Sequence, residues 1–130
     1  VLRDGGDVVI VSTGPAAVAA SLGAADLLAT GAVTAGVLHA HTLKPFDTAT
    51  LVGSAARARL VVAVEEHWRS GGLGSTVAET LAETTPRRVE RIGVPDAFVT
   101  RVGTHTELLD DAGLSAERIA ARIRAVLTGC

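Results

Sequence analysis

Short apolar runs alternate along the chain with longer stretches in which apolar and polar residues mix. Four of the runs are rich in β-branched residues and bounded by glycine, proline or polar clusters, as is typical of buried strands. They cover residues 8–11, 33–39, 60–64 and 89–92. Strands that alternate with helical stretches predict an α/β domain with a mostly parallel sheet covered on both faces.

Capping residues mark the ends of the first predicted helices. Pro15 suits the first turn of a helix over residues 16–29, and Gly31 suits the C′ position that follows it. Asp47 can accept a backbone hydrogen bond as the N-cap of a helix over residues 48–58. The first half of the chain therefore predicts two crossover helices between three strands.

The second half of the chain predicts three more helices. One follows a glycine turn and covers residues 76–83, and a short one covers residues 106–110 and ends at Gly113. Ser115 is the predicted cap of the last helix, whose apolar positions recur every three or four residues on one face. These positions are Ile119, Ile123 and Val126.

Composition narrows the class of protein. The chain has 130 residues, of which 48% are hydrophobic and 20% charged, and this indicates one globular domain. Its net charge of −2, with both signs interspersed, argues against a nucleic-acid surface, which would need a basic stripe. No apolar run approaches about 18 residues, so we expect no membrane span.

The ends of the chain suggest that it is part of something larger. The sequence begins at Val1, contains no methionine and reaches its first strand within a few residues. We therefore expect residues 1–130 to form a single domain from a longer chain, or a small subunit that starts further upstream. Cys130 is the only cysteine, which excludes an internal disulfide and fits a cytoplasmic protein.

A Glu-Glu-His sequence closes the third predicted strand. Ligands gather beyond the carboxyl ends of strands in open α/β sheets, and a carboxylate that orients an imidazole can support acid–base chemistry. However, no nucleophile or metal-ligand spacing accompanies Glu65, Glu66 and His67. We favour the alternative in which a glutamate accepts N–H bonds from a loop or packs at an interface, and His67 is a surface contact.

The glycine turn that follows is the second candidate site. Gly71, Gly72, Gly74 and Ser75 precede a predicted helix, whose free N–H groups could bind an anion. The spacing matches neither a dinucleotide fingerprint nor a P-loop, and Arg69 is the only basic residue close in sequence. We therefore favour a tight turn in which glycine permits close backbone packing.

The remaining histidines and the single lysine define no further site. His39 and His41 have the spacing of neighbours on a strand, and His105 lies far away in sequence. No cysteine or additional histidine completes a zinc set, and Lys44 is more often a solvated loop charge than an anion contact. Taken alone, these residues indicate an α/β domain and do not define its function.

Several segments, taken in order, resemble the C-terminal domain of the transketolase family. They are the opening strand at residues 7–14 (DVVIVSTG), the "KPFD" loop at 42–47 (TLKPFD), the "VEEH…GGLGS" segment at 64–75, the "RIGIPDxF" segment at 91–98 (RIGVPDAF) and the "ELL…GLS" stretch at 107–115. Each is weak alone, but the ordered set is specific and covers nearly the whole chain.

The resemblance implies a particular fold, and it implies that other domains of the enzyme bind the cofactor. The fold would be a three-layer α/β/α sandwich whose five-stranded sheet is mostly parallel, with one antiparallel strand, and we place the fifth strand near residues 98–102. The family's thiamine diphosphate and Mg²⁺ are bound by two other domains, which hold the diphosphate and the pyrimidine ring. The motifs of those domains are absent here, so no catalytic or cofactor-binding residue carries over.

What carries over is a role in assembly. In the family this domain packs on the pyrimidine-binding domain and helps to form the homodimer, which makes those domains, in the same chain or a separate subunit, the expected partners. The candidate interface or anion contacts are Glu66, His67, Arg69, Gly71, Gly72, Gly74 and Ser75.

The resemblance leaves the subfamily open. His67 and residues 95–98 favour transketolase, especially its split bacterial forms, whereas residues 68–70 are closer to the β subunits of 2-oxoacid dehydrogenases. A 1-deoxyxylulose-5-phosphate synthase is the third relative. The leading hypothesis is a domain that is not catalytic alone, in an enzyme that moves a two-carbon ketol unit between sugar phosphates. The rival is a regulatory domain that binds a small molecule or nucleotide at the strand ends.

Overall fold

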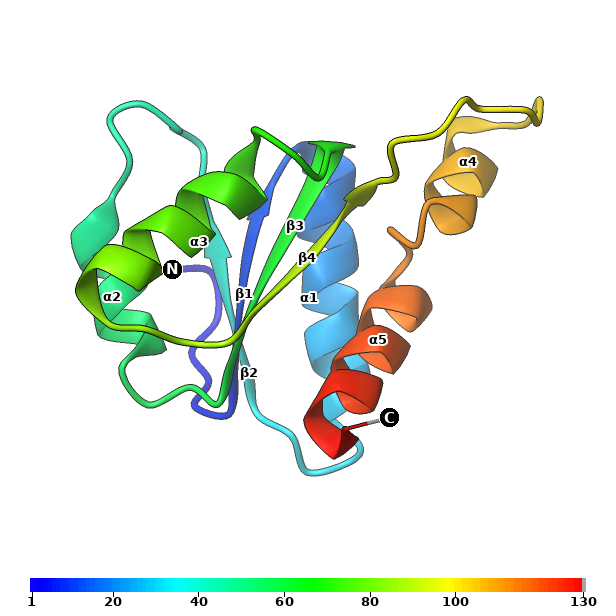
Figure 1. The fold of residues 1–130 in the computed structure, drawn as a ribbon. Coiled ribbons are helices and arrows are strands. Elements are labelled where there is room, and N and C mark those ends of the chain that lie inside the picture. Colours follow the sequence, from blue (N-terminus) through cyan, green and yellow to red (C-terminus); the bar gives the residue numbers. More distant parts are fainter. Residues whose placement is uncertain (130) are drawn as a thin grey trace.

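A four-stranded parallel sheet sets the frame on which the other elements are placed (Figure 1). The computed structural model describes residues 1–129. The strands lie in the order β2-β1-β3-β4, and each neighbouring pair is parallel. In chain order the elements are β1 Val8–Thr13, α1 Pro15–Ala29, β2 Ala35–His39, α2 Thr48–Ala55, β3 Leu60–Trp68, α3 Leu73–Thr84, β4 Val89–Val94, α4 His105–Asp111 and α5 Ala116–Thr128.

Helices cover both faces of the sheet, as the alternation of elements predicts. α1 and α5 lie against one face, and α2 and α3 lie against the other (Figure 1). The side chains of β3 alternate between two apolar cores, with Val62 and Val64 on the α1–α5 side and Val61 and Ala63 on the α2–α3 side. The three-layer α/β/α architecture is therefore confirmed.

The order of the strands places a topological switch point between β1 and β3. From β1 the chain crosses to β2 on one side, and it later enters β3 on the other side of β1. The segments that leave β1 and β3 run to α1 and α3, on opposite faces of the sheet (Figure 1). Ligands in open α/β sheets usually bind at the carboxyl ends of strands where the chain diverges in this way.

The number of strands differs from the expectation of five. Within residues 1–129 there are four, and the segment 98–102 is irregular, with the side chains of Phe98 and Val102 96% and 98% exposed. The antiparallel element lies at the other end of the chain, where Arg3 pairs with Val37 in an isolated bridge beside β2. Residues 98–102 have no neighbouring strand to pair with, which is why a β-rich composition alone gives no strand there.

The end of one helix, α2, was predicted imperfectly. α2 ends at Ala55, three residues early, because the Arg87 guanidinium donates to the carbonyl oxygens of Ala55 and Ala56 at 3.2 and 2.8 Å and so satisfies the helix end. Gly31 follows the cap of α1 as predicted, but the left-handed residue is Ala32, with φ of 60°.

The predicted caps are present. Asp47 accepts a hydrogen bond from the Thr50 N–H at 3.0 Å, and Ser115 caps α5. The apolar stripe of α5 is buried, as its spacing predicts. Within residues 1–129 no helix combines the length and apolar character needed to span a bilayer.

Candidate functional site at the carboxyl ends of the strands

Glu65, near the end of β3, is buried and bound to the start of α3. Its side chain is 2% exposed, and its two oxygens accept hydrogen bonds from the N–H groups of Leu73 at 2.8 Å and Gly74 at 2.9 Å. These donors belong to the first turn of a helix, where N–H groups have no partner within the helix. A side chain from β3 therefore caps α3, and the helix starts three residues before its predicted start.

Glu66 does the same for the helix on the opposite face. One of its oxygens accepts a hydrogen bond from the Ala17 N–H at 2.9 Å, in the first turn of α1. Its other oxygen lies 3.9 Å from Nε2 of His105, the first residue of α4. Because neighbouring residues of a strand point to opposite faces, two consecutive glutamates cap one helix in each outer layer.

These contacts show what each side chain of the Glu-Glu-His sequence binds within the domain. Both glutamates accept N–H bonds from helix starts, whereas we had expected one of them to accept N–H bonds from a loop or to pack at an interface. His67 is exposed, and its Nδ1 lies 3.1 Å from the carbonyl oxygen of Trp68. The acid–base arrangement, in which a glutamate orients His67, is not formed.

The glycine turn is packed tightly against Glu65. Gly72 is the N-cap of α3, and a Cβ atom placed on it would lie 2.0 Å from an oxygen of Glu65. A Cβ on Gly74 would lie 2.9 Å from Cδ of Arg91. Gly71 has φ of +81° and open space around it, and its N–H donates to the Ser75 hydroxyl at 2.9 Å. Close packing therefore favours glycine at positions 72 and 74, and the positive φ favours glycine at position 71.

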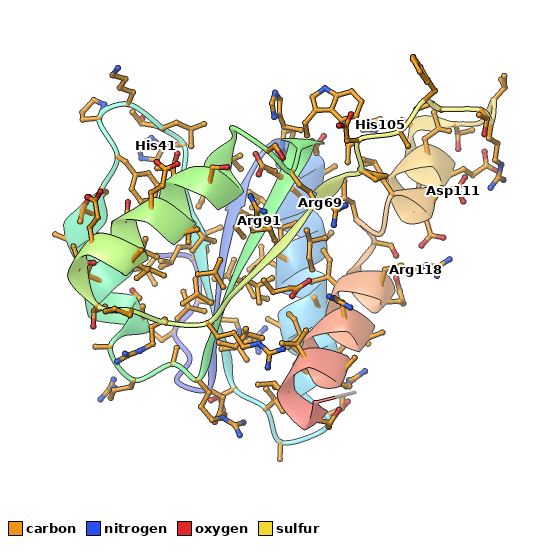
Figure 2. All side chains as sticks on the ribbon, viewed as in Figure 1. His41, Arg69, Arg91, His105, Asp111 and Arg118 are labelled. Carbon is orange, nitrogen blue, oxygen red and sulfur yellow. The ribbon has the colours of Figure 1, made fainter. Side chains whose placement is uncertain are left out.

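A polar hollow opens beside this turn, along the outer edge of β4. Its volume is about 670 Å³, and its lining includes Trp68, Arg69, Arg91 and Asp96. Figure 2 shows Arg69 and Arg91 close together there, and Nη1 of Arg91 donates to the Arg69 carbonyl oxygen at 3.2 Å. The sequence singled out Arg69 but missed Arg91, which no local motif connects to the turn.

The other candidates are dispersed around this end of the sheet. His39 and His41 form an edge-to-face pair with ring centroids 5.9 Å apart, while His105 lies across the sheet (Figure 2). Lys44 is exposed on the loop between β2 and α2. Within the described residues, no group of three or more His, Cys, Asp or Glu side chains could hold a metal ion.

The described residues do not fit a diphosphate and its metal. A diphosphate would need free N–H groups at a helix start, a metal ion or both. The starts of α1 and α3, which follow the two strands at the switch point, are already bound to carboxyl groups of the same chain.

These features define a class of protein: a doubly wound α/β domain whose strand ends serve internal packing. The family model for the transketolase C-terminal domain matches residues 1–119. The chain therefore belongs to the transketolase C-terminal domain family.

Individual relatives agree with this assignment. A transketolase family protein of Sinorhizobium fredii is 44% identical over 95% of this chain and 36% of its own length. A 1-deoxy-D-xylulose-5-phosphate synthase of Syntrophotalea carbinolica is 45% identical over 95% of this chain and 19% of its own length. The chain thus spans about a third or a fifth of the length of the relatives it matches.

A solved structure is similar over nearly all of this domain. A split-gene transketolase, solved as an inactive β4 tetramer, has a TM-score of 0.87 and 41% identity over 98% of this chain and 40% of its own. The arrangement of the sheet and helices is therefore shared with a split transketolase.

Proposed function

We propose that this chain is the C-terminal assembly domain of a thiamine diphosphate-dependent transketolase. The whole enzyme would move a two-carbon ketol unit between sugar phosphates, and this domain would be inactive alone. The observation that carries the proposal is that Glu65 and Glu66 accept hydrogen bonds from the helix starts at which a domain of this topology would bind its ligand. The domain would then contact the rest of the enzyme through its outer surface.

The missing functions would be supplied by other parts of the enzyme. The family model and the 36% coverage of the Sinorhizobium relative support a single domain within a larger unit. We infer that thiamine diphosphate and Mg²⁺ bind in the diphosphate-binding and pyrimidine-binding domains, in the same chain or a partner subunit. The solved relative is a β4 tetramer, and we extend self-association to this chain and to the whole enzyme, in the cytoplasm.

The proposal is tested by adding back the missing domains. Calorimetry with thiamine diphosphate and Mg²⁺ should detect no binding to the chain alone, and the chain should transfer no ketol groups. Co-expression with the upstream domains should give a stable complex with ketol-transfer activity that is lost when this chain is omitted. Micromolar cofactor binding at one site per chain, or full activity without it, would overturn the proposal.

The synthase similarity favours one alternative. Because the Syntrophotalea synthase is 45% identical to this chain, the same reconstituted enzyme should also be assayed for 1-deoxy-D-xylulose 5-phosphate formation. Product formation there, without ketol transfer between sugar phosphates, would assign the domain to a synthase. Neither activity would be expected if the domain belongs to a 2-oxoacid dehydrogenase β subunit or binds a regulatory nucleotide.

A further inference from the structure

The outer edge of β4 has no neighbouring strand within residues 1–129. β4 ends the strand order β2-β1-β3-β4, and it lies between α3 on one face of the sheet and α5 on the other (Figure 1). At the opposite edge, the start of the chain covers β2, where the Val37 N–H donates to the Arg3 carbonyl oxygen at 2.9 Å. Only the edge of β4 therefore leaves a row of backbone groups with which another strand can pair.

The register of β4 against β3 shows which of its backbone groups face outward. The Val61 N–H donates to the Arg88 carbonyl oxygen at 3.0 Å, and Val61 is in register with Val89. Because successive residues of a strand direct their backbone groups to opposite sides, Val89 and Arg91 direct theirs away from β3. Each of these two residues has one N–H donor and one C=O acceptor for an added strand.

Two adjoining hollows leave space for side chains along this edge. The hollow of about 670 Å³ described above extends from Trp68 to Val89, and a second, of about 390 Å³, extends towards α5. The residues common to both linings are Arg69, Glu90 and Arg91. An added strand could therefore place its side chains beside β4 without displacing another part of the domain.

The charges along the edge are balanced towards α5 but not towards α3. On the α5 side, Nε of Arg122 donates to Glu90 at 2.8 Å, which makes a neutral pair. On the α3 side, Nη1 of Arg91 donates to the Arg69 carbonyl oxygen at 3.2 Å and lies 3.5 Å from the Ser75 hydroxyl. These neutral acceptors hold Arg91 in place without cancelling its charge. None of the ion pairs within residues 1–129 involves Arg69 or Arg91.

The edge as a whole is basic in a chain that is acidic overall. The net charge of the chain is −2, but arginines outnumber acidic residues in the two linings. The charged lining residues are Arg69, Arg91, Arg118 and Arg122, against Glu90 and Asp96. Arginine presents a rigid fork of donors that matches a carboxylate, so the complementary partner is acidic.

We propose that the outer edge of β4 binds an extended acidic segment of another protein as an additional strand. The backbone groups of Val89 and Arg91 pair with the segment, as in other cases of strand addition to a sheet edge. Carboxylates at alternate positions of the segment point to one face and meet Arg69 and Arg91. Charge selects against a second copy of this chain, because pairing two β4 edges would place like-charged arginines at one interface.

The probe for this edge is a synthetic peptide of alternating glutamate and valine, blocked at both ends and about as long as β4. Fluorescence anisotropy of the dye-labelled peptide should show saturable binding in the micromolar range. Trp68 is the only tryptophan of the chain and lines the larger hollow, so its own fluorescence should change in parallel. A lysine–valine peptide should not bind. A glutamate–valine peptide N-methylated at every residue keeps its charge, loses its backbone donors and should not bind either.

Variants of the chain test the charge and the backbone separately. The Arg69→Gln, Arg91→Gln double variant should weaken binding on the order of tenfold, as expected for the loss of two exposed ion pairs. Arg57→Gln is the matched control, because Arg57 is exposed on the loop between α2 and β3, at the other end of the sheet, and should leave binding unchanged.

Val89→Pro removes an outward N–H group at the first residue of an edge strand, a position that tolerates proline. This variant should bind the peptide more weakly while its arginines are intact. Melting curves show whether each variant is folded. If Val89→Pro does not fold, the N-methylated peptide still tests the backbone contact on the parent chain.

Any of three results would overturn the inference. The first is equal binding of the N-methylated peptide, because charge alone would then account for the affinity. The second is a double arginine variant that binds as tightly as the parent chain. The third is a peptide that binds the chain alone but not the chain reconstituted with its upstream domains, because the enzyme itself would then cover this edge.

Discussion

At the residue scale, Glu65 is the side chain on which most local structure depends. Glu65→Gln keeps the shape but replaces one of the two acceptor oxygens with an amide NH₂ group, so either the Leu73 or the Gly74 N–H loses its partner. A buried donor left without an acceptor costs about 1–3 kcal/mol. We expect urea denaturation to show a loss of stability of that order.

Glu79→Gln is the control for this prediction. Glu79 is an exposed residue of the same helix, α3. Its substitution removes the same charge without removing a cap, and should change the free energy of unfolding by less than about 0.5 kcal/mol. Equal losses for the two variants would mean that net charge, rather than the cap, stabilises α3.

The glycines of the turn give a second prediction at this scale. Gly72→Ala and Gly74→Ala each force a Cβ atom into occupied space, and overpacking of this kind costs about 1–3 kcal/mol. Gly53→Ala is the contrasting control, because it lies in α2 with no atom within 4 Å of its Cβ position and should stabilise the chain by up to about 1 kcal/mol.

Melting measured with and without phosphate distinguishes a packing role of this turn from an anion-binding role. If packing dominates, as we expect, both glycine variants lower the melting temperature equally with and without phosphate. A parent chain that phosphate stabilises in a saturable manner, with variants that melt normally but lose this stabilisation, would contradict us. That result would also support the regulatory-domain hypothesis.

At the scale of elements, the capping box of α4 predicts a pH dependence. Hydrogen bonds from the Thr104 backbone and hydroxyl lower the pKa of Glu107 below its ordinary value of 4.5. A carboxyl whose pKa is lower in the folded state contributes stability above its unfolded pKa, and this contribution is lost as the pH falls through the folded value. Melting temperatures should therefore decline as the pH is lowered below about 4.5.

Thr104→Val isolates the contribution of this one cap. The variant keeps the β-branched shape but removes the hydroxyl that Glu107 and its N–H contact. Its melting temperature should be lower at neutral pH and should fall less steeply with acid than that of the parent. Parallel pH profiles would show that other carboxyls with lowered pKa values, such as Asp47 and Asp110, account for the acid sensitivity.

The elements themselves could be predicted because their signals are local. β-branched runs give β1 to β4, and Asp47 and Ser115 mark helix starts through contacts only three residues away. The start of α3 was placed wrongly because its cap, Glu65, comes from the preceding strand. The end of α2 was placed wrongly because Arg87, 32 residues later in the chain, binds its terminal carbonyl group.

The candidate site shows the same division between local and distant contacts. The sequence located Glu65, Glu66 and the glycine turn, since all three lie at or just beyond the end of one strand. It could not show that Glu66 reaches Ala17, 49 residues earlier, because that contact depends on the order of strands in the sheet. The exposure of Phe98 and Val99 was missed because these residue types are common in strands, and only the absence of a neighbouring strand distinguishes an exposed segment from a buried one.

At the scale of the whole molecule, assembly should change one end of the domain. If the loops at the carboxyl ends of the strands face the rest of the enzyme, their backbone N–H groups should exchange with deuterium more slowly in the reconstituted enzyme than in the chain alone. We expect this protection over residues 40–46, 68–72 and 95–104. Mass spectrometry of proteolytic fragments measures each segment separately.

The opposite end of the sheet provides an internal control. The loops at 30–34, 56–59 and 85–88 lie at the amino ends of the strands and should exchange at the same rate in both states. Equal protection at both ends would indicate general stiffening instead of a directed interface. No protection at the carboxyl end would contradict the proposed orientation of the domain.

Glu65 and Glu66 also affect the register that β3 adopts against β1 during folding. If β3 slid by one residue against β1, Glu65 would turn towards α1 and Glu66 towards α3, and the alternating apolar residues would exchange cores. Both helices would lose their caps in the same step. An insertion or deletion within residues 60–66 should accordingly lower the stability of the domain far more than one within residues 98–102. The two glutamates and the helix starts that they cap thus favour a single register of β3 against β1.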